Sequence, residues 1–127
     1  MKEYTGSCLC GNITYKVKGE PIFPHLCSCR MCQKWSGALT VAWTEFSLKT
    51  FIWNGPGGKP SFYRSSQKTQ RYFCPKCGST LGAIDDGSET IGITIASLRK
   101  PASVKPGKHH SYQEKAPSWW KVKVRIS

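Results

Sequence analysis

Cys27-Ser28-Cys29-Arg30-Met31-Cys32 places three thiols within six consecutive residues. Three thiolates from one short loop can bind a zinc ion and leave its fourth tetrahedral position open for a substrate or water, which distinguishes a reactive zinc site from a closed structural one. The alternative is a second structural zinc with a remote fourth ligand, for which His25, His109 and His110 are the available histidines. The motif therefore predicts a zinc site of one of these two kinds.

The other four cysteines form two close pairs. Cys74-Pro75-Lys76-Cys77-Gly78 has the spacing of a zinc-knuckle turn, in which two cysteines three residues apart present both sulfurs to one metal. Cys8 and Cys10 also lie in a turn bounded by glycines. Because the entropic cost of loop closure grows only logarithmically with loop length, the two pairs can bind the same metal despite the long segment between them. We expect Cys8, Cys10, Cys74 and Cys77 to bind one structural zinc.

The charge of the predicted site favours thiol chemistry. A zinc ion bound by three thiolates carries a net negative charge, so it should suit a thiol ligand better than water activation. Arg30, Lys34 and other nearby cations could offset this charge and hold acidic groups of the substrate. The chain has only 7 acidic residues, and none lies beside a nucleophile in the pattern of a catalytic triad.

Outside the cysteine motifs, apolar and polar residues alternate over short segments that are separated by Gly, Pro, Asn and Asp. Such short alternating segments are typical of strands in an all-β domain. A single helical turn, stopped at Gly37, is expected after the three-thiol motif. The expected strands span residues 12–18, 38–43, 46–53, 61–65, 70–73, 79–84 and 90–95, with a basic edge strand at 121–126.

The length of 127 residues fits one domain, residues 1–127. No apolar run follows Met1 that could serve as the core of a signal peptide, and an odd count of seven cysteines fits a disulfide framework poorly. We therefore expect a reducing compartment, the cytoplasm. No stretch of about 18 apolar residues is present, so no transmembrane helix is expected.

The net charge of +12 is concentrated toward the C-terminus, where residues 99–127 hold eight basic side chains against Glu114 alone. A second functional hypothesis follows, a zinc-stabilised binding module that uses this basic segment for nucleic acid or an acidic protein partner. Trp119 and Trp120 could stack on bases, although we expect one ring in the core and one against the surface. No dense Lys/Arg run is present, so the sequence favours an ordinary solvated surface, and nucleic acid is not the favoured partner.

Three motifs occur in a specific order: Gly6-x-Cys8-x-Cys10-Gly11, Cys27-x-Cys29-x-x-Cys32 followed by Ser36-Gly37, and Phe73-Cys74-x-x-Cys77-Gly78-Ser79. Together they resemble the glutathione-dependent formaldehyde-activating enzyme family, which also includes centromere protein V. His110 followed by Tyr112, Lys115 and Trp119 is similar to the closing pattern of that family. The resemblance extends from about Gly6 to Trp119, most of the chain.

The resemblance implies a mainly β fold, the zinc-stabilised β-tent of several small coiled antiparallel sheets. It implies two Zn²⁺ ions per chain, a structural one on Cys8, Cys10, Cys74 and Cys77, and a catalytic one on Cys27, Cys29 and Cys32 that can be lost more easily. The implied activity is that of a carbon-sulfur lyase that acts on a small-molecule thiol, glutathione, and formaldehyde. Two departures leave the substrate open: Arg99-Lys100 stand where many relatives have an acidic residue, and the segment after Trp119 is strongly basic.

Overall fold

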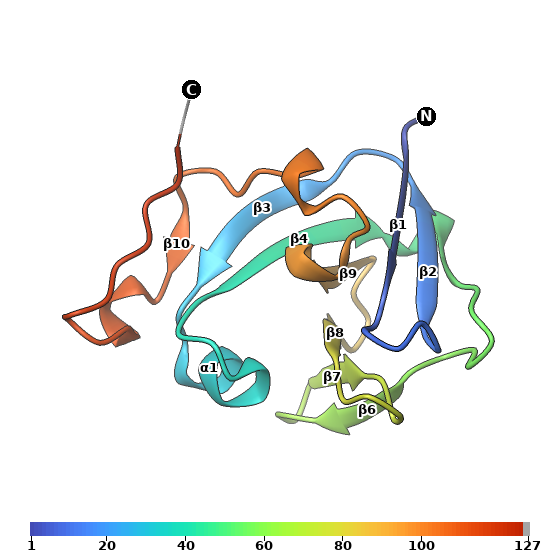
Figure 1. The fold of residues 1–127 in the computed structure, drawn as a ribbon, viewed down its shortest axis with the longest axis horizontal. Coiled ribbons are helices and arrows are strands. Elements are labelled where there is room, and N and C mark those ends of the chain that lie inside the picture. Colours follow the sequence, from blue (N-terminus) through green and yellow to red (C-terminus); the bar gives the residue numbers. More distant parts are fainter. Residues whose placement is uncertain (126–127) are drawn as a thin grey trace.

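The computed structural model describes residues 1–125, whose strands form two sheets (Figure 1). One sheet has three strands in the order β1-β2-β5, and the other has seven in the order β10-β3-β4-β9-β8-β7-β6. Neighbouring strands are antiparallel except for β10 and β3, which are parallel. The strands span β1 (Glu3–Ser7), β2 (Thr14–Lys18), β3 (Ile22–Cys27), β4 (Val41–Ser47), β5 (Phe51–Trp53), β6 (Ser61–Arg64), β7 (Thr69–Phe73), β8 (Thr80–Asp85), β9 (Thr90–Thr94) and β10 (His110–Ser111).

Helical structure is short. The α-helix α1 (Arg30–Ser36) lies near the ends of β3 and β4 (Figure 1), and it ends at Gly37, whose φ of 76° few other residues adopt. The remaining helices are 3₁₀ turns, η1 (Leu48–Thr50), η2 (Ile95–Ser97), η3 (Pro101–Ser103) and η4 (Gln113–Lys115). Within residues 1–125, none of these helices has the length and hydrophobicity needed to span a bilayer.

The main core lies where the three-stranded sheet meets one face of the seven-stranded sheet. Tyr15 and Val17 from β2 pack in one cluster with buried residues of the larger sheet, among them Phe46 and Ile93. Because side chains alternate along a strand, Trp43 and Glu45 of β4 lie on the opposite face of the larger sheet. Trp43 belongs to a second, smaller core with Cys27, Cys32 and Val41. The seven-stranded sheet therefore separates the main core from the surface that carries the three-cysteine motif.

The prediction of a mainly β fold is confirmed. The hairpins of residues 61–73 and 79–95 occur as β6–β7 and β8–β9, and the predicted strands at 12–18 and 38–43 correspond to β2 and the first part of β4. The helical turn predicted at 33–37 is the second half of α1, which begins three residues earlier, inside the cysteine motif.

Three features differ from the sequence-based expectation. The segment 46–53 is not one strand, because the 3₁₀ turn η1, capped by the Ser47 hydroxyl, separates the end of β4 from β5. Strands β1, β3 and β10 were not predicted. The basic segment 121–125 is not a strand, and Ile126, the last residue of the predicted edge strand, lies outside the described residues.

Candidate metal centres and active site

The four cysteines outside the trio converge at one point. Cys8 and Cys10 follow β1, Cys74 and Cys77 follow β7, and all four sulfurs lie within 4.8 Å of one another. The Sγ–Sγ distance is 3.6 Å between Cys8 and Cys10 and 3.8 Å between Cys10 and Cys74. A tetrahedral zinc with Zn–S bonds of about 2.3 Å separates its sulfurs by about 3.8 Å, whereas a disulfide brings them to about 2 Å. The cluster fits a four-thiolate zinc site.

Backbone amides around this cluster point at its sulfurs. The amides of Lys76 and Cys77 lie 3.4 and 3.5 Å from the Cys74 sulfur, and the Ile13 amide donates to the Cys8 sulfur at 3.3 Å. Such donors orient metal ligands and stabilise thiolates. The Ser79 hydroxyl and amide are the leading causes that lower the pKa of Cys77 to about 5.

Cys27, Cys29 and Cys32 form the second cluster, with their sulfurs within 4.8 Å of one another. Cys27 ends β3, Cys29 is the N-cap of α1, and Cys32 lies in the first turn of the helix. The Sγ–Sγ distance between Cys27 and Cys32 is 3.7 Å, which again matches the edge of a zinc–sulfur tetrahedron rather than a disulfide. The short helix thus folds three cysteines from one loop into three corners of a metal site.

Among residues 1–125, no His, Asp or Glu joins this trio as a fourth donor. The three histidines have other partners: His25 Nδ1 lies 2.8 Å from the Phe23 carbonyl, His109 Nε2 lies 2.9 Å from the Ser111 hydroxyl, and His110 Nε2 lies 2.8 Å from the Ser28 hydroxyl. Within the described residues the trio offers three sulfur donors, a set that fits a zinc site with an open fourth position.

Arg71 of β7 supplies the positive charge at the trio. Its side chain is only 8% exposed, and Nη1 lies 3.6 Å from the Cys32 sulfur. The guanidinium stacks over the Trp35 ring at 5.1 Å and over the Trp43 ring at 6.0 Å, and Nε donates to the Ser65 hydroxyl. Burial with these aromatic partners fixes the guanidinium beside the sulfur.

The thiols of Cys32 and Cys27 shift each other's pKa in opposite directions. The pKa of Cys32 is lowered to about 5, first by the hydrogen bond with Cys27 and further by Cys29 and Arg71, against the opposing effect of burial. The pKa of Cys27 is raised, again chiefly by its bond with Cys32. At a separation of 3.7 Å the two thiols titrate as a pair and not independently.

The cations that the sequence indicated are not the ones at the site. Arg30 and Lys34 are exposed, and the Arg30 guanidinium bonds to the Gln33 side chain instead. Arg71, which the sequence analysis did not identify, is the cation beside the sulfurs, where Arg30 and Lys34 were expected. Arg99 and Lys100, the departures from the family pattern, line a different pocket with Lys2 and Glu3.

The trio opens into a pocket of about 330 Å³ on the face of the seven-stranded sheet opposite the main core. Its walls combine the sulfurs with charged and polar side chains; the lining residues include Cys27, Cys29, Cys32, His25, Trp43, Glu45, Thr69, Arg71, Asp85, Ser88 and Thr90. A larger pocket of about 460 Å³ lies near Cys8 and Ala42 but has no His, Lys, Arg, Asp or Glu in its walls. We therefore assign the smaller pocket as the candidate active site on its chemistry.

Ser28, between Cys27 and Cys29, is fully buried and hydrogen-bonded at every polar group. Its hydroxyl lies 2.6 Å from Thr40 Oγ1 and 2.8 Å from His110 Nε2, and its amide donates to the Ser111 carbonyl. Its carbonyl accepts a bond from Gln33 Nε2 at 3.0 Å. These bonds fix the cysteine loop to α1 and to β10.

The C-terminal segment is placed against the cysteine loop by β10 and by Gln33, whose amide nitrogen also reaches the Lys115 carbonyl at 3.3 Å. His110 is half-buried in this contact and bonds to Ser28. Neither tryptophan of the tail lies in the core: Trp119 is 77% exposed and Trp120 is half-buried beside His110.

A β-bulge aims His25 at the pocket. The register of β3 against β4 shifts between Ile22 and His25, and Phe23 within the bulge has a φ of 46°, which is unusual for a bulky residue. The Phe23 carbonyl accepts the Nδ1–H of His25, so the neutral ring carries its free lone pair on Nε2. The bulge thereby defines the tautomer of a histidine that lines the site.

A sequence model described as "Glutathione-dependent formaldehyde-activating enzyme" matches residues 3–115. The chain belongs to this family. An uncharacterized lyase of Schizosaccharomyces pombe is 35% identical over 81 residues, which cover 64% of this chain and 57% of that protein, so the chain spans little more than half of its length. A Halomonas elongata protein, provisionally named glutathione-dependent formaldehyde-activating enzyme, is 24% identical over 94% of this chain and 81% of its own length.

The fold also occurs in a solved structure. A crystal structure of a Rhodobacter sphaeroides protein superposes with a TM-score of 0.62, covering 84% of this chain and 98% of that one, at 21% sequence identity. At this identity the likeness concerns the fold alone.

Proposed function

We propose that this protein is a zinc-dependent carbon-sulfur lyase that joins a small thiol to a small aldehyde, with glutathione and formaldehyde as the leading substrates. In the forward direction the thiol sulfur forms a bond to the carbonyl carbon, the π bond of the carbonyl breaks, and the oxygen takes up the proton that the thiol released. The product is a hydroxymethyl thioether, and no oxidant or reductant is needed. The two substrates are taken from the family description and from the name of the Halomonas relative.

The observation that carries this proposal is the three-cysteine cluster, which has no fourth protein donor among residues 1–125 and opens into a pocket. Cys27, Cys29 and Cys32 would hold the catalytic zinc, and Cys8, Cys10, Cys74 and Cys77 the structural one, giving two zinc ions per chain. Zinc bound at the trio would supply an open coordination position at which a substrate sulfur is stabilised as thiolate.

Arg71 would balance the charge of this site. Three thiolates and a divalent zinc sum to one negative charge, and a fourth thiolate would add another. The buried guanidinium beside Cys32 offsets part of that charge at short range, where it is weakly screened by solvent. The residue would therefore favour both retention of the metal and binding of an ionised thiol.

His25 is our candidate for moving the proton. Its Nδ1–H is held by the Phe23 carbonyl, which leaves Nε2 free to accept the proton of the incoming thiol and to return it to the oxygen of the adduct.

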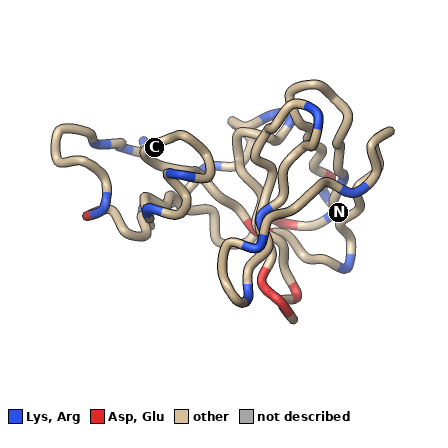
Figure 2. The backbone as a smooth tube through the Cα atoms, turned by 90° about the horizontal axis from the view of Figure 1, so that it is seen from below, with Lys and Arg blue, Asp and Glu red and all other residues tan. Residues whose placement is uncertain are grey.

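We further propose that residues 1–127 act as one domain in a reducing compartment such as the cytoplasm, because the chemistry requires free thiolates at both clusters. The structure adds no observation in favour of a nucleic-acid module. In Figure 2 Lys and Arg are distributed over the described chain, and the acidic residues gather mainly at one projecting turn.

The test is the rate at which ¹³C-formaldehyde exchanges with its glutathione adduct, measured by NMR against the uncatalysed rate. Wild-type protein loaded with zinc should accelerate the exchange. Cys29→Ser should abolish the acceleration with little change in melting temperature, whereas Cys77→Ser should lower the melting temperature strongly. If the wild type leaves the rate unchanged, or if Cys29→Ser destabilises the fold as much as Cys77→Ser, the trio is a structural site and the proposal is wrong.

A further inference from the structure

Arg71 has one donor group, the terminal nitrogen Nη2, that its neighbours leave unused. Its Nε donates to the Ser65 hydroxyl, and its Nη1 lies 3.6 Å from the Cys32 sulfur. Within residues 1–125, Nη2 has no hydrogen-bond partner, and every fully buried side-chain nitrogen or oxygen has one. Nη2 is therefore not fully buried. Because Arg71 lines the pocket at the trio, this nitrogen is available to a ligand there.

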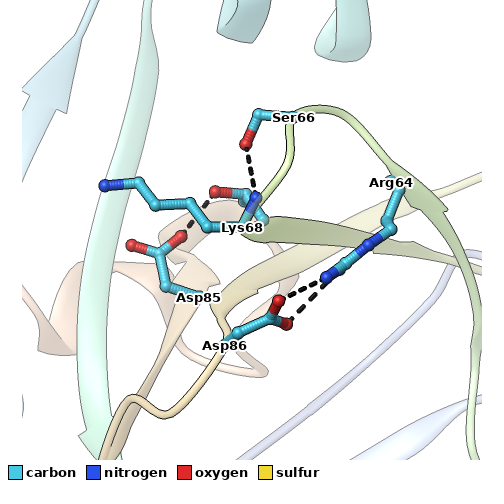
Figure 3. Close-up of polar contacts among 6 residues, drawn as sticks. Arg64, Ser66, Lys68, Asp85 and Asp86 are labelled. Atoms are coloured by element: carbon cyan, nitrogen blue, oxygen red, sulfur yellow. Dashed lines mark hydrogen bonds and ion pairs between the residues drawn. The ribbon is translucent and has the colours of Figure 1, made fainter.

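No carboxylate neutralises Arg71. Among the Lys, Arg, Asp and Glu residues of the described chain it is the one that is buried, with 8% of its surface exposed. The one ion pair within 4.0 Å in residues 1–125 joins Arg64 to Asp86, and Figure 3 shows the Arg64 guanidinium directed at both oxygens of that carboxylate. A buried cation is costly unless an anionic group compensates it. Arg71 has the cysteine sulfurs on one side and an open position on the other, so negative charge that develops in the pocket would be stabilised there.

The guanidinium is fixed in direction. Its face lies over the Trp35 and Trp43 rings, while Ser65 holds Nε and the Cys32 sulfur lies beside Nη1. The donors of a guanidinium form a rigid planar fork, so these contacts also fix where Nη2 points. A donor that is already in place stabilises a developing charge without reorganisation during the reaction.

Other polar side chains of the pocket wall are less suited to bind an anionic oxygen. The Thr90 hydroxyl donates to Glu45, and the Ser88 hydroxyl lies 3.0 Å from the Thr90 carbonyl. The Thr69 hydroxyl donates to Asp85. These hydroxyl protons are already in use, and the two carboxylates repel negative charge. No lysine of the described chain lines the pocket.

From this arrangement we propose that Arg71 is a catalytic residue whose Nη2–H donates a hydrogen bond to the carbonyl oxygen of the aldehyde. This inference rests on the proposed function. As the thiolate sulfur bonds to the carbonyl carbon, the electron pair of the C=O π bond moves to the oxygen, and Nη2 stabilises the negative charge that develops there. His25 returns to this oxygen the proton that it took from the thiol, so no further reactant is consumed. The guanidinium then contacts the sulfur side of the site through Nη1 and the oxygen through Nη2.

The first experiment compares Arg71→Lys with the wild type, both saturated with zinc. Lysine keeps the positive charge, but its single nitrogen cannot replace two donors of a planar fork. Glutathione affinity, measured by calorimetry, should change little. The exchange rate of ¹³C-formaldehyde with the adduct should fall by about 100-fold, the usual effect of removing one donor to an oxyanion.

Arg64→Lys is the matched control, and it should keep the wild-type affinity and exchange rate. Arg64 pairs with Gln70, the residue before Arg71, so the side chains of the two arginines point to opposite faces of the sheet.

The second experiment needs no substitution. In zinc-loaded wild type, the ¹⁵N resonances of the Arg71 guanidinium should move when formaldehyde is added to the glutathione complex, in a step separate from any change caused by glutathione alone. This readout reports contact with the adduct oxygen independently of turnover.

Two results would overturn the inference and leave the proposed function standing. One is an exchange rate in Arg71→Lys that falls no more than the glutathione affinity does, and the other is a set of Arg71 resonances that formaldehyde leaves where glutathione alone placed them. Arg71 would then act on the sulfurs or on glutathione itself. A wild type that does not accelerate the exchange would refute the inference and the proposed function together.

Discussion

Arg71 and Cys32 are 39 residues apart in sequence, yet the guanidinium and the sulfur lie 3.6 Å apart. If the trio binds zinc as proposed, three thiolates on a divalent ion would leave one excess negative charge, which a cation at this position would offset. The guanidinium is kept in place by Trp35 and Trp43, whose rings are nearly parallel at a centroid distance of 5.5 Å. Under the proposed function, Arg71 would position and balance the charge of the three cysteines that hold the zinc.

Replacing Arg71 by Met should lower the affinity of the trio for zinc by about 10- to 100-fold, the usual cost of losing a group that supports a metal ligand. The zinc affinity of Arg71→Lys should lie between those of the wild type and Arg71→Met, because lysine keeps the charge but not the planar group that stacks on tryptophan. The affinities are measured by competition with a chromogenic chelator, with zinc at the four-cysteine site as the internal reference. An unchanged affinity in Arg71→Met would contradict this role.

The sequence predicted how the seven cysteines divide into two clusters, because their spacing along the chain is itself the signal. It did not predict Arg71, although the strand at 70–73 was expected. Alternation puts Arg71 and Phe73 on one face of that strand, but which face meets the Cys27 loop depends on the order of seven strands. The two cations close to the motif in sequence, Arg30 and Lys34, were the wrong choice because α1 turns both toward solvent.

At the level of elements, the cysteine loop depends on a parallel strand from the far end of the chain. β10 pairs with the last residues of β3, and its His110 reaches the hydroxyl of Ser28 between two of the ligands. Buried hydroxyls of this kind cost free energy when a partner is removed.

Ser28→Ala should lower the free energy of unfolding by about 1–3 kcal/mol, because Thr40 and His110 would lose a buried partner. Urea denaturation of the zinc-loaded protein measures the change. Ser66→Ala, at an exposed turn, should change the same quantity little. If Ser28→Ala and Ser66→Ala are equally stable, the hydrogen bonds of Ser28 do not stabilise the cysteine loop.

His110 should make the stability depend on pH. Burial lowers its pKa below the ordinary value of 6.5, and the neighbouring His109 adds to the effect. The unfolded chain therefore binds the proton more readily than the folded one, so stability falls as the pH drops below the unfolded value of 6.5. Glu114 and Lys121 line the same small pocket and contribute fixed charges of opposite sign.

The measurement is the unfolding midpoint from about pH 7.5 to about pH 5.5, around the ordinary histidine pKa. Wild type should lose more stability over this range than His110→Gln, which keeps a hydrogen-bonding group but does not titrate. The comparison removes the contribution of the metal ligands and of the other histidines. An identical loss of stability in the wild type and in His110→Gln would show that protonation of His110 does not cause the pH dependence.

The strands that the sequence missed have a common cause. β3 contains Pro24 and exposes Ile22 and Phe23, so it has none of the alternation that indicates a half-buried strand. β10 has only two residues, too few for any periodicity. Hairpins joined by Gly-containing turns were predicted correctly, because there the turn residues and the alternation agree.

For the molecule as a whole, the two cysteine clusters have different consequences. The four-cysteine cluster joins the turn after β1 to the end of β7, and so ties the small sheet to the large one. The trio lies within one loop and one helix, so its loss removes no long-range link. Loss of the four-cysteine cluster should therefore destabilise the fold, whereas loss of the trio should mainly abolish activity.

The measurement that tests this account most directly is the zinc content per chain before and after treatment with a mild chelator, combined with glutathione titration. We predict two zinc ions, of which the chelator removes one; the protein stays folded and loses its affinity for glutathione in the same step. Two zinc ions that resist the chelator equally, in a protein that does not bind glutathione, would contradict the assignment of the trio as the reactive site.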